Sequence, residues 1–250
     1  MNRSMTWSLV IIFIAALVLR PEHALSQLKL DLETSVAFSG YNDVRIPGDA
    51  GTFFSLTEEL EADPTLALRG KFSYVLSEKS TIELLGAPLS VESRGQLDRD
   101  LDFEGVTFPA GTQLQALYRF NSYRFTYRYA LYNTEKVHFG LGGTGKIRDA
   151  EISVSGGGLE SKKTNVGFVP LINFRFWWML TPKAHLLVEG DALAAPQGRA
   201  EDILVAGAYR VNSRVTFKLG YRILEGGADN DEVYNFALFH YAVLGLIIEL

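Results

Sequence analysis

The chain of 250 residues carries 24 Lys and Arg against 29 Asp and Glu, and its formal net charge of −5 gives no reason to expect nucleic acid as a partner. It has no cysteine, which excludes a disulfide framework, a lipoprotein attachment site and thiolate chemistry. A mean hydropathy of +0.07 is low for a helical membrane protein, but it is normal for a barrel in which only alternate residues meet lipid.

The first residues have the organisation of a secretory signal peptide. Arg3 supplies the positive charge, residues 7–19 form an apolar core, and Ala24-Leu25-Ser26 places small residues at positions −3 and −1 before Gln27. The apolar run is shorter than the ~20 residues that a helix needs to cross a bilayer. We therefore expect a signal peptide over residues 1–26 and one exported domain over residues 27–250.

The exported domain begins with a strand that alternates between apolar and polar residues. Leu28, Leu30, Leu32, Val36 and Phe38 share one face, and Lys29, Asp31, Glu33, Ser35 and Ser39 share the other. A period of two is the signature of a β-strand with one side in an apolar medium. Further strands are expected over residues 65–76 and 81–91, where Gly86 and Pro88 predict a bulge or an early exit from the sheet.

The most informative stretch is residues 112–132, in which both halves alternate but the apolar face changes parity. Leu114, Ala116, Tyr118 and Phe120 form the apolar face of the first half, and Tyr123, Phe125, Tyr127, Tyr129 and Leu131 that of the second. Arg124 and Arg128 lie opposite these aromatic residues. A slip of one residue at Asn121-Ser122 predicts a β-bulge. An aromatic face opposite guanidinium groups fits a strand with lipid outside and a wet interior.

Turn lengths predict how the strands are connected. Further strands are expected from Val137 and over residues 166–180, 184–191, 201–210, 215–225 and 233–250. Residues 77–80, 133–136, 181–183 and 211–214 are short turns, whereas longer loops are expected around Asn42, Ser93, Gly156, Ala192 and Gly226. This asymmetry is typical of outer-membrane barrels, whose periplasmic turns are short. The predicted fold is all-β, a transmembrane antiparallel up-and-down β-barrel of about ten strands, with eight as the alternative.

The whole exported domain resembles the small single-chain β-barrels of the Gram-negative outer membrane. Its last residues, GLIIEL, look like the C-terminal assembly signal of that class, with Gly245 followed by Leu246, Ile248 and Leu250, although the class usually ends in an aromatic residue. The resemblance implies a monomer in the cell outer membrane, in contact with outer-membrane lipid and lipopolysaccharide. It also implies that the barrel assembly machinery recognises the C-terminal strand.

Charged residues on the inward faces fall at similar heights above the short turns. They are Arg69, Arg124, Arg128, Lys146, Glu189, Asp191 and Arg222. Our first interpretation is a network of ion pairs that fills a narrow lumen, in which Arg124 and Arg222 pair with Glu189 or Asp191. Because cations outnumber carboxylates in this set, a small anion-preferring pore or a binder of anionic ligands is the alternative.

An outer-membrane barrel enzyme is the third interpretation, since the omptin proteases are ten-stranded and carry carboxylate and histidine at the barrel mouth. Here His138 and His185 lie beside short turns and His240 has an outward register, so we expect no catalytic residue. The acidic residues Glu189, Asp191 and Asp202, near Arg199, are the best remaining candidate for a ligand site. No zinc, haem or nucleotide motif is present, so neither a metal site nor a cofactor is expected.

Overall fold

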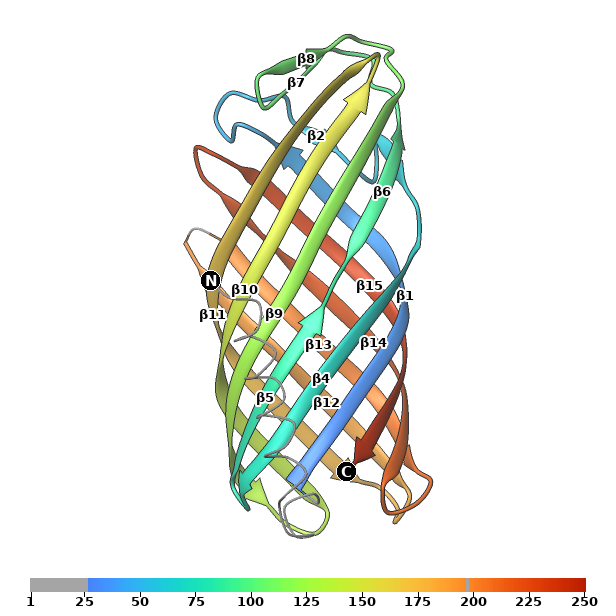
Figure 1. The fold of residues 1–250 in the computed structure, drawn as a ribbon, viewed down its shortest axis with the longest axis vertical. Helices are drawn as coiled ribbons and strands as arrows, with labels where there is room; N and C mark the ends of the chain where they lie inside the picture. Colours follow the sequence, from blue (N-terminus) through green and yellow to red (C-terminus); the bar gives the residue numbers. More distant parts are fainter. Residues whose placement is uncertain (1–26, 197) are drawn as a thin grey trace, which may run out of the picture.

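The computed structural model describes residues 27–196 and 198–250, and the signal peptide expected over residues 1–26 lies outside these ranges. The described residues form a closed antiparallel barrel of ten wall strands (Figure 1), as the alternation predicted. In chain order the wall consists of β1 (Leu28–Arg45), β4 (Thr65–Ser77), β5 (Ser80–Ala87) continued by β6 (Ser90–Gly95), β9 (Leu114–Asn133), β10 (Val137–Gly156), β11 (Leu159–Met179), β12 (Ala184–Ala195), β13 (Gly198–Arg210), β14 (Val215–Asp229) and β15 (Tyr234–Glu249). Among these residues, no helix is long and apolar enough to cross a membrane.

The barrel closes because β1 pairs with β15 along nearly its whole length, from Lys29 opposite Glu249 to Arg45 opposite Tyr234. Strands β5 and β6 count as one wall strand, since both pair with β9 in one continuous register. The chain leaves the ladder only around Pro88, where proline cannot donate a ladder hydrogen bond. The interruption predicted there is confirmed.

A belt of apolar side chains surrounds the lower part of the wall. Exposed members come from every side of the barrel and include Leu32, Phe38, Leu66, Leu68, Leu84, Tyr123, Phe125, Tyr127, Ile172, Trp178, Val205, Tyr209, Phe217, Leu219, Tyr221 and Leu244. An exposed apolar surface of this extent is unfavourable in water. A closed barrel pairs all its backbone polar groups within the wall, so it is stable in a lipid bilayer. The belt is therefore the membrane-facing surface.

Strand β9 is regular, so the β-bulge predicted at Asn121-Ser122 is wrong. Its pairing with β10 runs without a shift from Gln115 to Ala130, and the even-numbered side chains face the lumen throughout. The only irregularity in this pair lies lower, opposite the Phe139–Gly140 step. What changes near Asn121 is the surroundings of the strand: below it the lumen is polar and the outside is lipid, and above it the lumen is apolar and the outside is water.

Strand β10 shows the same inversion at the same level. Lys146 faces the lumen below it, and Ile152 and Val154 are buried in the lumen above it. On the outer face, Ile147 is exposed to the belt, whereas Glu151 pairs with Arg119 at 3.1 Å above the belt. Both faces of the wall therefore change polarity at one height, which marks the outer edge of the membrane.

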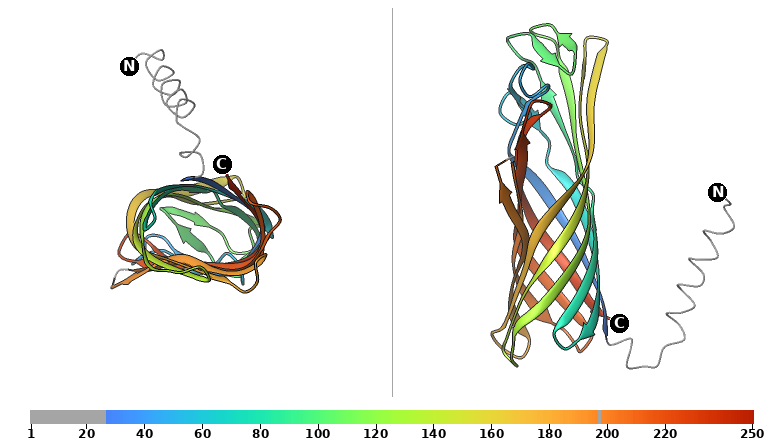
Figure 2. Two further views of the ribbon diagram at one scale, coloured as in Figure 1. Left: turned by 90° about the horizontal axis from the view of Figure 1, so that it is seen from below. Right: turned by 90° about the vertical axis from the view of Figure 1, so that its left-hand side faces the viewer.

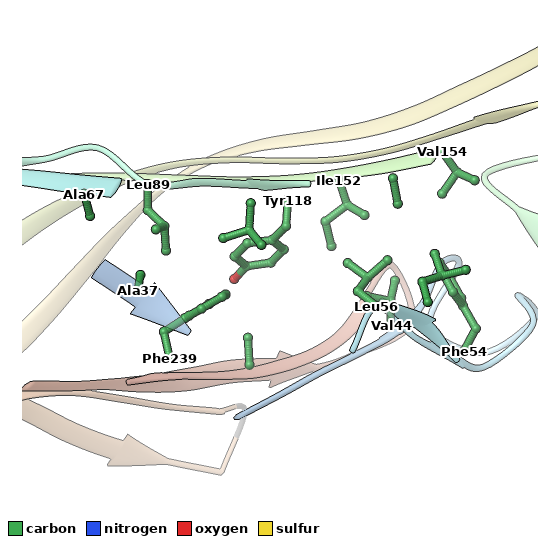
Figure 3. Packing of buried hydrophobic residues seen from close by; sticks show 14 of the residues in the cluster. Ala37, Val44, Phe54, Leu56, Ala67, Leu89, Tyr118, Ile152, Val154 and Phe239 are labelled. Carbon is green, nitrogen blue, oxygen red and sulfur yellow. The ribbon is translucent and has the colours of Figure 1, made fainter. Parts of the chain in front are cut away.

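The upper lumen contains an apolar core built from the wall and from two folded loops. Loop 46–64 contains β2 (Phe54–Ser55) and β3 (Leu60–Ala62), and loop 96–113 contains the hairpin of β7 (Leu101–Phe103) and β8 (Val106–Phe108). Figure 2 shows this hairpin across the lumen when the barrel is viewed from below. Phe54 and Phe103 meet edge to face at 6.1 Å and are fully buried. Figure 3 shows the wall side of the core, where Tyr118 packs against Phe239 at 5.4 Å.

Three of the five loops expected to be long are short in the structure. β10 continues to Gly156 and β11 starts at Leu159, β12 ends at Ala195 and β13 starts at Gly198, and β14 and β15 are separated by residues 230–233. The residues predicted to form these loops belong to strands that extend beyond the membrane, where the outward face is polar. Gly157 and Gly158 both have positive φ, which suits the two-residue turn between β10 and β11.

The topology places both ends of the described chain at the end with the short turns, which we expect to face the periplasm. Single cysteines at Asp49 and Asp229 should then react with an impermeant maleimide in intact cells. Cysteines at Glu78 and Lys183, in the opposite turns, should react only after the outer membrane is opened. All four positions are exposed, so access alone decides the result. The reverse pattern would contradict this orientation.

An ion pair joins the two folded loops. Arg99 donates to Glu59 Oε1 at 2.6 Å and Oε2 at 3.2 Å, and also to the carbonyl oxygen of Phe53 at 2.8 Å. These hydrogen bonds from Arg99 hold the pKa of the Glu59 carboxyl below its ordinary value of about 4.3. Because the folded pKa is depressed, the stabilisation is present above pH ~4 and is lost as the pH falls through the folded pKa.

Hydrogen exchange can test this contact. After correction for intrinsic rates, amides of residues 52–60 should keep their protection from pH 7 to about pH 4 and lose it below. Glu59→Gln should remove the same protection already at pH 7, because the neutral amide cannot form the ion pair. Glu61→Gln, an exposed neighbour in β3, is the matched control and should exchange like the wild type. Equal protection in both variants would show that the ion pair does not hold the loops.

Candidate functional site

The lumen at the level of the apolar belt is crossed by a dense set of ionised side chains, which we call the charge layer. Its cations are Arg69, Lys71, Arg124, Arg128, Lys146, Arg175, Lys218 and Arg222, and its carboxylates are Asp31, Glu33, Glu83, Glu189, Asp191 and Asp202. Most of these side chains are buried, and they come from every wall strand except β15. A charge without a partner is expensive at such a site, so the pairing pattern decides what the layer can do.

Asp202 in β13 is the centre of the upper half of the layer. Its Oδ2 atom accepts from Arg69 at 2.9 Å and from Arg124 at 2.6 Å, and its Oδ1 atom accepts from Arg222 at 2.5 Å. Three guanidinium groups from β4, β9 and β14 thus meet on one carboxylate. Because β4 and β9 lie across the barrel from β13, Asp202 links opposite parts of the wall through the lumen.

Asp191 in β12 is the second carboxylate of the upper half. It accepts from Arg124 at 2.7 Å, from the Thr144 hydroxyl at 2.6 Å and from the Asn173 amide at 2.8 Å. Arg124 therefore bridges Asp191 and Asp202, and its Nε donates to Ser122 at 2.9 Å. The upper half of the layer fixes its carboxylates with several charge-assisted hydrogen bonds each, which are the strong class.

Two lysines organise the lower half. Lys218 Nζ lies 2.7 Å from Asp31 and 2.6 Å from Glu33, and Lys71 Nζ lies 2.6 Å from Glu189. Oxygens of these three carboxylates come within 4.8 Å of one another, a spacing that could hold a metal ion. The two ammonium groups, together with Arg222 on Glu33 and Arg175 on Glu189, already supply the positive charge that these carboxylates need.

Arg128 and Arg175 form the end of the layer nearest the short turns. Arg128 donates to Glu83 at 2.6 Å and to the Asn173 amide oxygen at 3.0 Å. Arg175 lies 3.4 Å from Glu189 and 5.7 Å from the centre of the Trp177 ring. The layer thus ends in guanidinium groups that face the short turns.

The structure brings six of the seven predicted lumen residues into ion pairs, and it corrects one pairing. Arg124 pairs with Asp191 as expected, but Arg222 pairs with Glu33 at 2.8 Å and with Asp202, and not with Glu189 or Asp191. β14 lies between β13 and β15, two strands from β1, so Arg222 reaches Glu33 in β1. That proximity exists only because the barrel closes.

Lys146 is the predicted lumen residue that makes no ion pair with any described carboxylate. It lies directly opposite Arg124 in the ladder of β9 and β10, where Asp191 and Asp202 are already engaged. Its ammonium instead lies 4.6 Å from the centre of the Phe120 ring, at the boundary with the apolar core. An aromatic ring stabilises a buried ammonium electrostatically, but less strongly than a carboxylate would.

Sequence reasoning missed seven members of the charge layer: Asp31, Glu33, Lys71, Glu83, Arg175, Asp202 and Lys218. Each has at least one outward apolar neighbour in its strand, so the signal was present. Asp31 and Glu33 were missed because β1 opens the domain, and no preceding turn gives their height. Arg175 was missed because its neighbours Phe174 and Phe176 dominate the pattern.

The acidic group near Arg199 does not form a ligand site of its own. Asp202, Asp191 and Glu189 turn into the charge layer, whereas Arg199 pairs with Glu225 at 2.7 Å. The histidines are also spread apart. His138 and His185 lie near the periplasmic turns, where His185 packs on Trp177, and His240 contacts Tyr221 on the outer face.

Comparison with known proteins gives the fold. No family model and no curated protein matches the sequence. The chain is similar to the outer membrane protease OmpT from Escherichia coli, with a TM-score of 0.56 and 10% identity over 89% of this chain and 96% of that chain. It also aligns with Ail, the attachment invasion locus protein of Yersinia pestis (TM-score 0.41, 8% identity, 88% and 99% covered). A third similar structure is the toluene transporter TodX of Pseudomonas putida, with a TM-score of 0.36 and 9% identity over 94% of this chain and 92% of that chain.

These structures are outer-membrane β-barrels of Gram-negative bacteria. At 10% identity the likeness to OmpT shows the fold alone, and the two lower scores carry no argument. The fold, the apolar belt and the closed wall agree with a place in the cell outer membrane.

The buried ion pairs predict which arginine the barrel depends on. Arg124→Ala should destabilise the barrel by about 3 kcal/mol, because it leaves Asp191 and Asp202 buried with fewer partners. Arg119→Ala is the matched control in the same strand, because Arg119 pairs with Glu151 on the outer face. This substitution should lower the free energy of unfolding by at most about 1 kcal/mol. Urea unfolding in lipid vesicles measures both. An unchanged midpoint for Arg124→Ala would rule out a stabilising charge layer.

Proposed function

We propose that this transmembrane β-barrel of the Gram-negative outer membrane is a closed scaffold that presents two folded loops at the cell surface and conducts no ions. The observation that carries the proposal is a lumen filled in two different ways along its height. The charge layer fills the membrane part, and the apolar core narrows the part above it. A pore would need a continuous wet path through both.

The charge layer supports a closed lumen because its cations and carboxylates touch. The cavity enclosed by Glu33, Arg69, Arg124, Asp202 and Arg222 has a volume of about 30 Å³. At ~10–15 Å³ for each water, it has room for about two molecules. A hydrated ion would have to break ion pairs that span the barrel. The charge layer therefore blocks the passage of ions and also stabilises the wall.

The apolar core supports the same conclusion independently. Loop residues Phe54, Leu56 and Phe103 belong to one buried apolar cluster with the wall residues Tyr118 and Phe239, and an apolar constriction of this kind excludes ions by remaining dry. The β7–β8 hairpin of these loops lies at the end of the barrel opposite the short turns (Figure 1). A scaffold of this shape acts by what its loops contact outside the cell, which makes an envelope or interaction role the best supported.

We further infer that the C-terminal strand is the segment the barrel assembly machinery recognises, and that the belt contacts outer-membrane lipid and lipopolysaccharide. Leu244 and Leu246 lie on the outer face of β15, which pairs with β1 to close the wall. Gly245 in the same strand has a separate role. A Cβ there would lie 2.4 Å from the Lys218 side chain, so glycine makes room for a cation of the charge layer.

An anion-binding role is the second candidate, and Lys146 favours it. The charge layer contains two more cations than carboxylates, and Lys146 is the one left without a carboxylate among the described residues. A site with an unneutralised cation attracts an anion. Because Lys146 lies opposite Arg124 and over the Phe120 ring, we infer that such a site would lie at the boundary between the charge layer and the upper lumen.

Planar-bilayer recordings test the closed scaffold. The wild type should give no conductance steps, and neither should a variant in which residues 98–110 are replaced by a short Gly-Ser linker, because the charge layer remains. Steps in the wild type would reject the proposal, and anion-selective steps would support the second candidate. Steps in the shortened variant alone would assign closure to the loops and not to the charge layer. A porin in the same bilayers controls for insertion.

A further inference from the structure

The wall of the barrel has an unpaired edge on one side. β11 and β12 pair only from Met179 opposite His185 up to Ile172 opposite Ala192, and β12 then ends at Ala195. The remaining part of β11, residues 159–171, is paired with β10 alone in the part of the chain that the structure describes. Higher up, Ser161 and Lys163 contact Glu104 in the turn of the β7–β8 hairpin. The edge is therefore uncovered between the hairpin and Ile172.

This edge lies at the outer margin of the apolar belt. Phe168 is 66% exposed and Ile172 is 56% exposed on the outward face of β11, and Phe168 lies opposite Ile147 in β10. Pro170 stands between them, and a proline has no N–H to offer a neighbouring strand, which is why proline is confined to edges in sheets. The gap between β11 and β12 thus opens toward the outer part of the membrane.

A cavity of about 390 Å³ lies behind the gap, and its volume is within the ~300–1,000 Å³ usual for small-molecule sites. Its walls are largely apolar, with Phe120, Ile152, Leu224 and Phe239 from four different strands and Leu193 from β12. The lining also includes Phe168 and Pro170, so the cavity extends to the outer face of the wall. An apolar body can therefore reach it from the side as well as from above.

Two cations line the same cavity without a carboxylate partner. Lys146 is 2% exposed and forms no ion pair with a described residue; its ammonium lies over the Phe120 ring, and Asp191 and Asp202 act on it only at longer range. Arg148, two residues further along β10, donates to Asn165, and its buried Nε has no hydrogen-bond partner. The other cations of the lining are already neutralised, since Arg199 pairs with Glu225 and Lys163 pairs with Glu104.

We propose that this cavity binds an amphiphile with one anionic head and a single apolar chain. The head, a carboxylate or a phosphate, accepts hydrogen bonds from Lys146 and Arg148. The chain lies against Phe120, Leu224 and Phe239 and reaches toward the gap between β11 and β12. The inference goes beyond the closed scaffold, because the charge layer keeps the lumen sealed below the cavity.

The charges of the site predict its selectivity. A neutral amphiphile would leave both cations without a partner, and a cationic one would be repelled, so an apolar chain alone is not sufficient for binding. The ligand can come from the outer leaflet through the gap or from the medium through the upper lumen. Both sources supply the same chemistry, and labelled probes distinguish them.

Binding can be measured with ¹³C-carboxyl dodecanoate and the barrel in lipid nanodiscs, which avoid competing detergent. Lys146→Met should weaken binding about tenfold, the loss of one charge-assisted hydrogen bond. Ala150→Phe should abolish it by filling the cavity, which Ala150 lines. Lys162→Met, an exposed lysine of β11, is the matched control and should bind like the wild type. Dodecanol and dodecylamine should not compete. Heat-modifiable migration on gels confirms that each variant is folded.

Photo-crosslinking locates the ligand and its source. A diazirine-labelled dodecanoate added to the medium should label residues of β14 and β15 around Leu224 and Phe239. A lysophosphatidylglycerol, which has one acyl chain, placed in the bilayer with a diazirine on that chain should label the same residues if the outer leaflet is the source. Equal binding by wild type, Lys146→Met and Ala150→Phe would overturn the proposal. Labelling by both probes confined to the outward residues Phe168 and Ile172 would overturn it as well.

Discussion

The structure depends on the need to neutralise charge in a lumen that is enclosed by an apolar wall. Arginine and lysine on the inward faces cannot reach water through a closed barrel, and all of those in the charge layer except Lys146 pair with a carboxylate from another strand. Asp202 receives three guanidinium groups from three different strands. The ion pairs thus do the work across the lumen that a hydrophobic core does in a soluble protein, and they close the channel as a consequence.

The second constraint is that polarity reverses on both faces at the same height. Below the outer membrane edge, apolar residues face lipid and polar residues face each other. Above it, the outward face meets water and the inward face packs on two folded loops, as Tyr118 and Phe239 do. A regular strand such as β9 therefore carries two opposite alternation patterns with no change in its geometry.

The cavity lies where these two regimes meet, and this explains its mixed lining. Its floor is the last cation of the charge layer, Lys146, and its walls are the first side chains of the apolar core. β12 and β13 end lower than β10 and β11, so the wall is incomplete at this height. The closed lumen and the lateral gap are compatible, because the seal lies below the gap.

The sequence by itself determined the barrel, its approximate strand number and the inward register of Arg69, Arg124, Arg128, Glu189, Asp191 and Arg222, since a period of two is local and survives folding. Only the tertiary structure decided the rest. The partner of Arg222 is Glu33 because β1 and β15 meet, a contact between distant parts of the chain that no local pattern encodes. A parity change such as that at Asn121-Ser122 can arise from a bulge or from a change in the surroundings of a regular strand. Sequence alternation cannot separate these two causes. Lys146 lacks a carboxylate for the same reason: its register was local, but its neighbours were fixed by closure of the barrel.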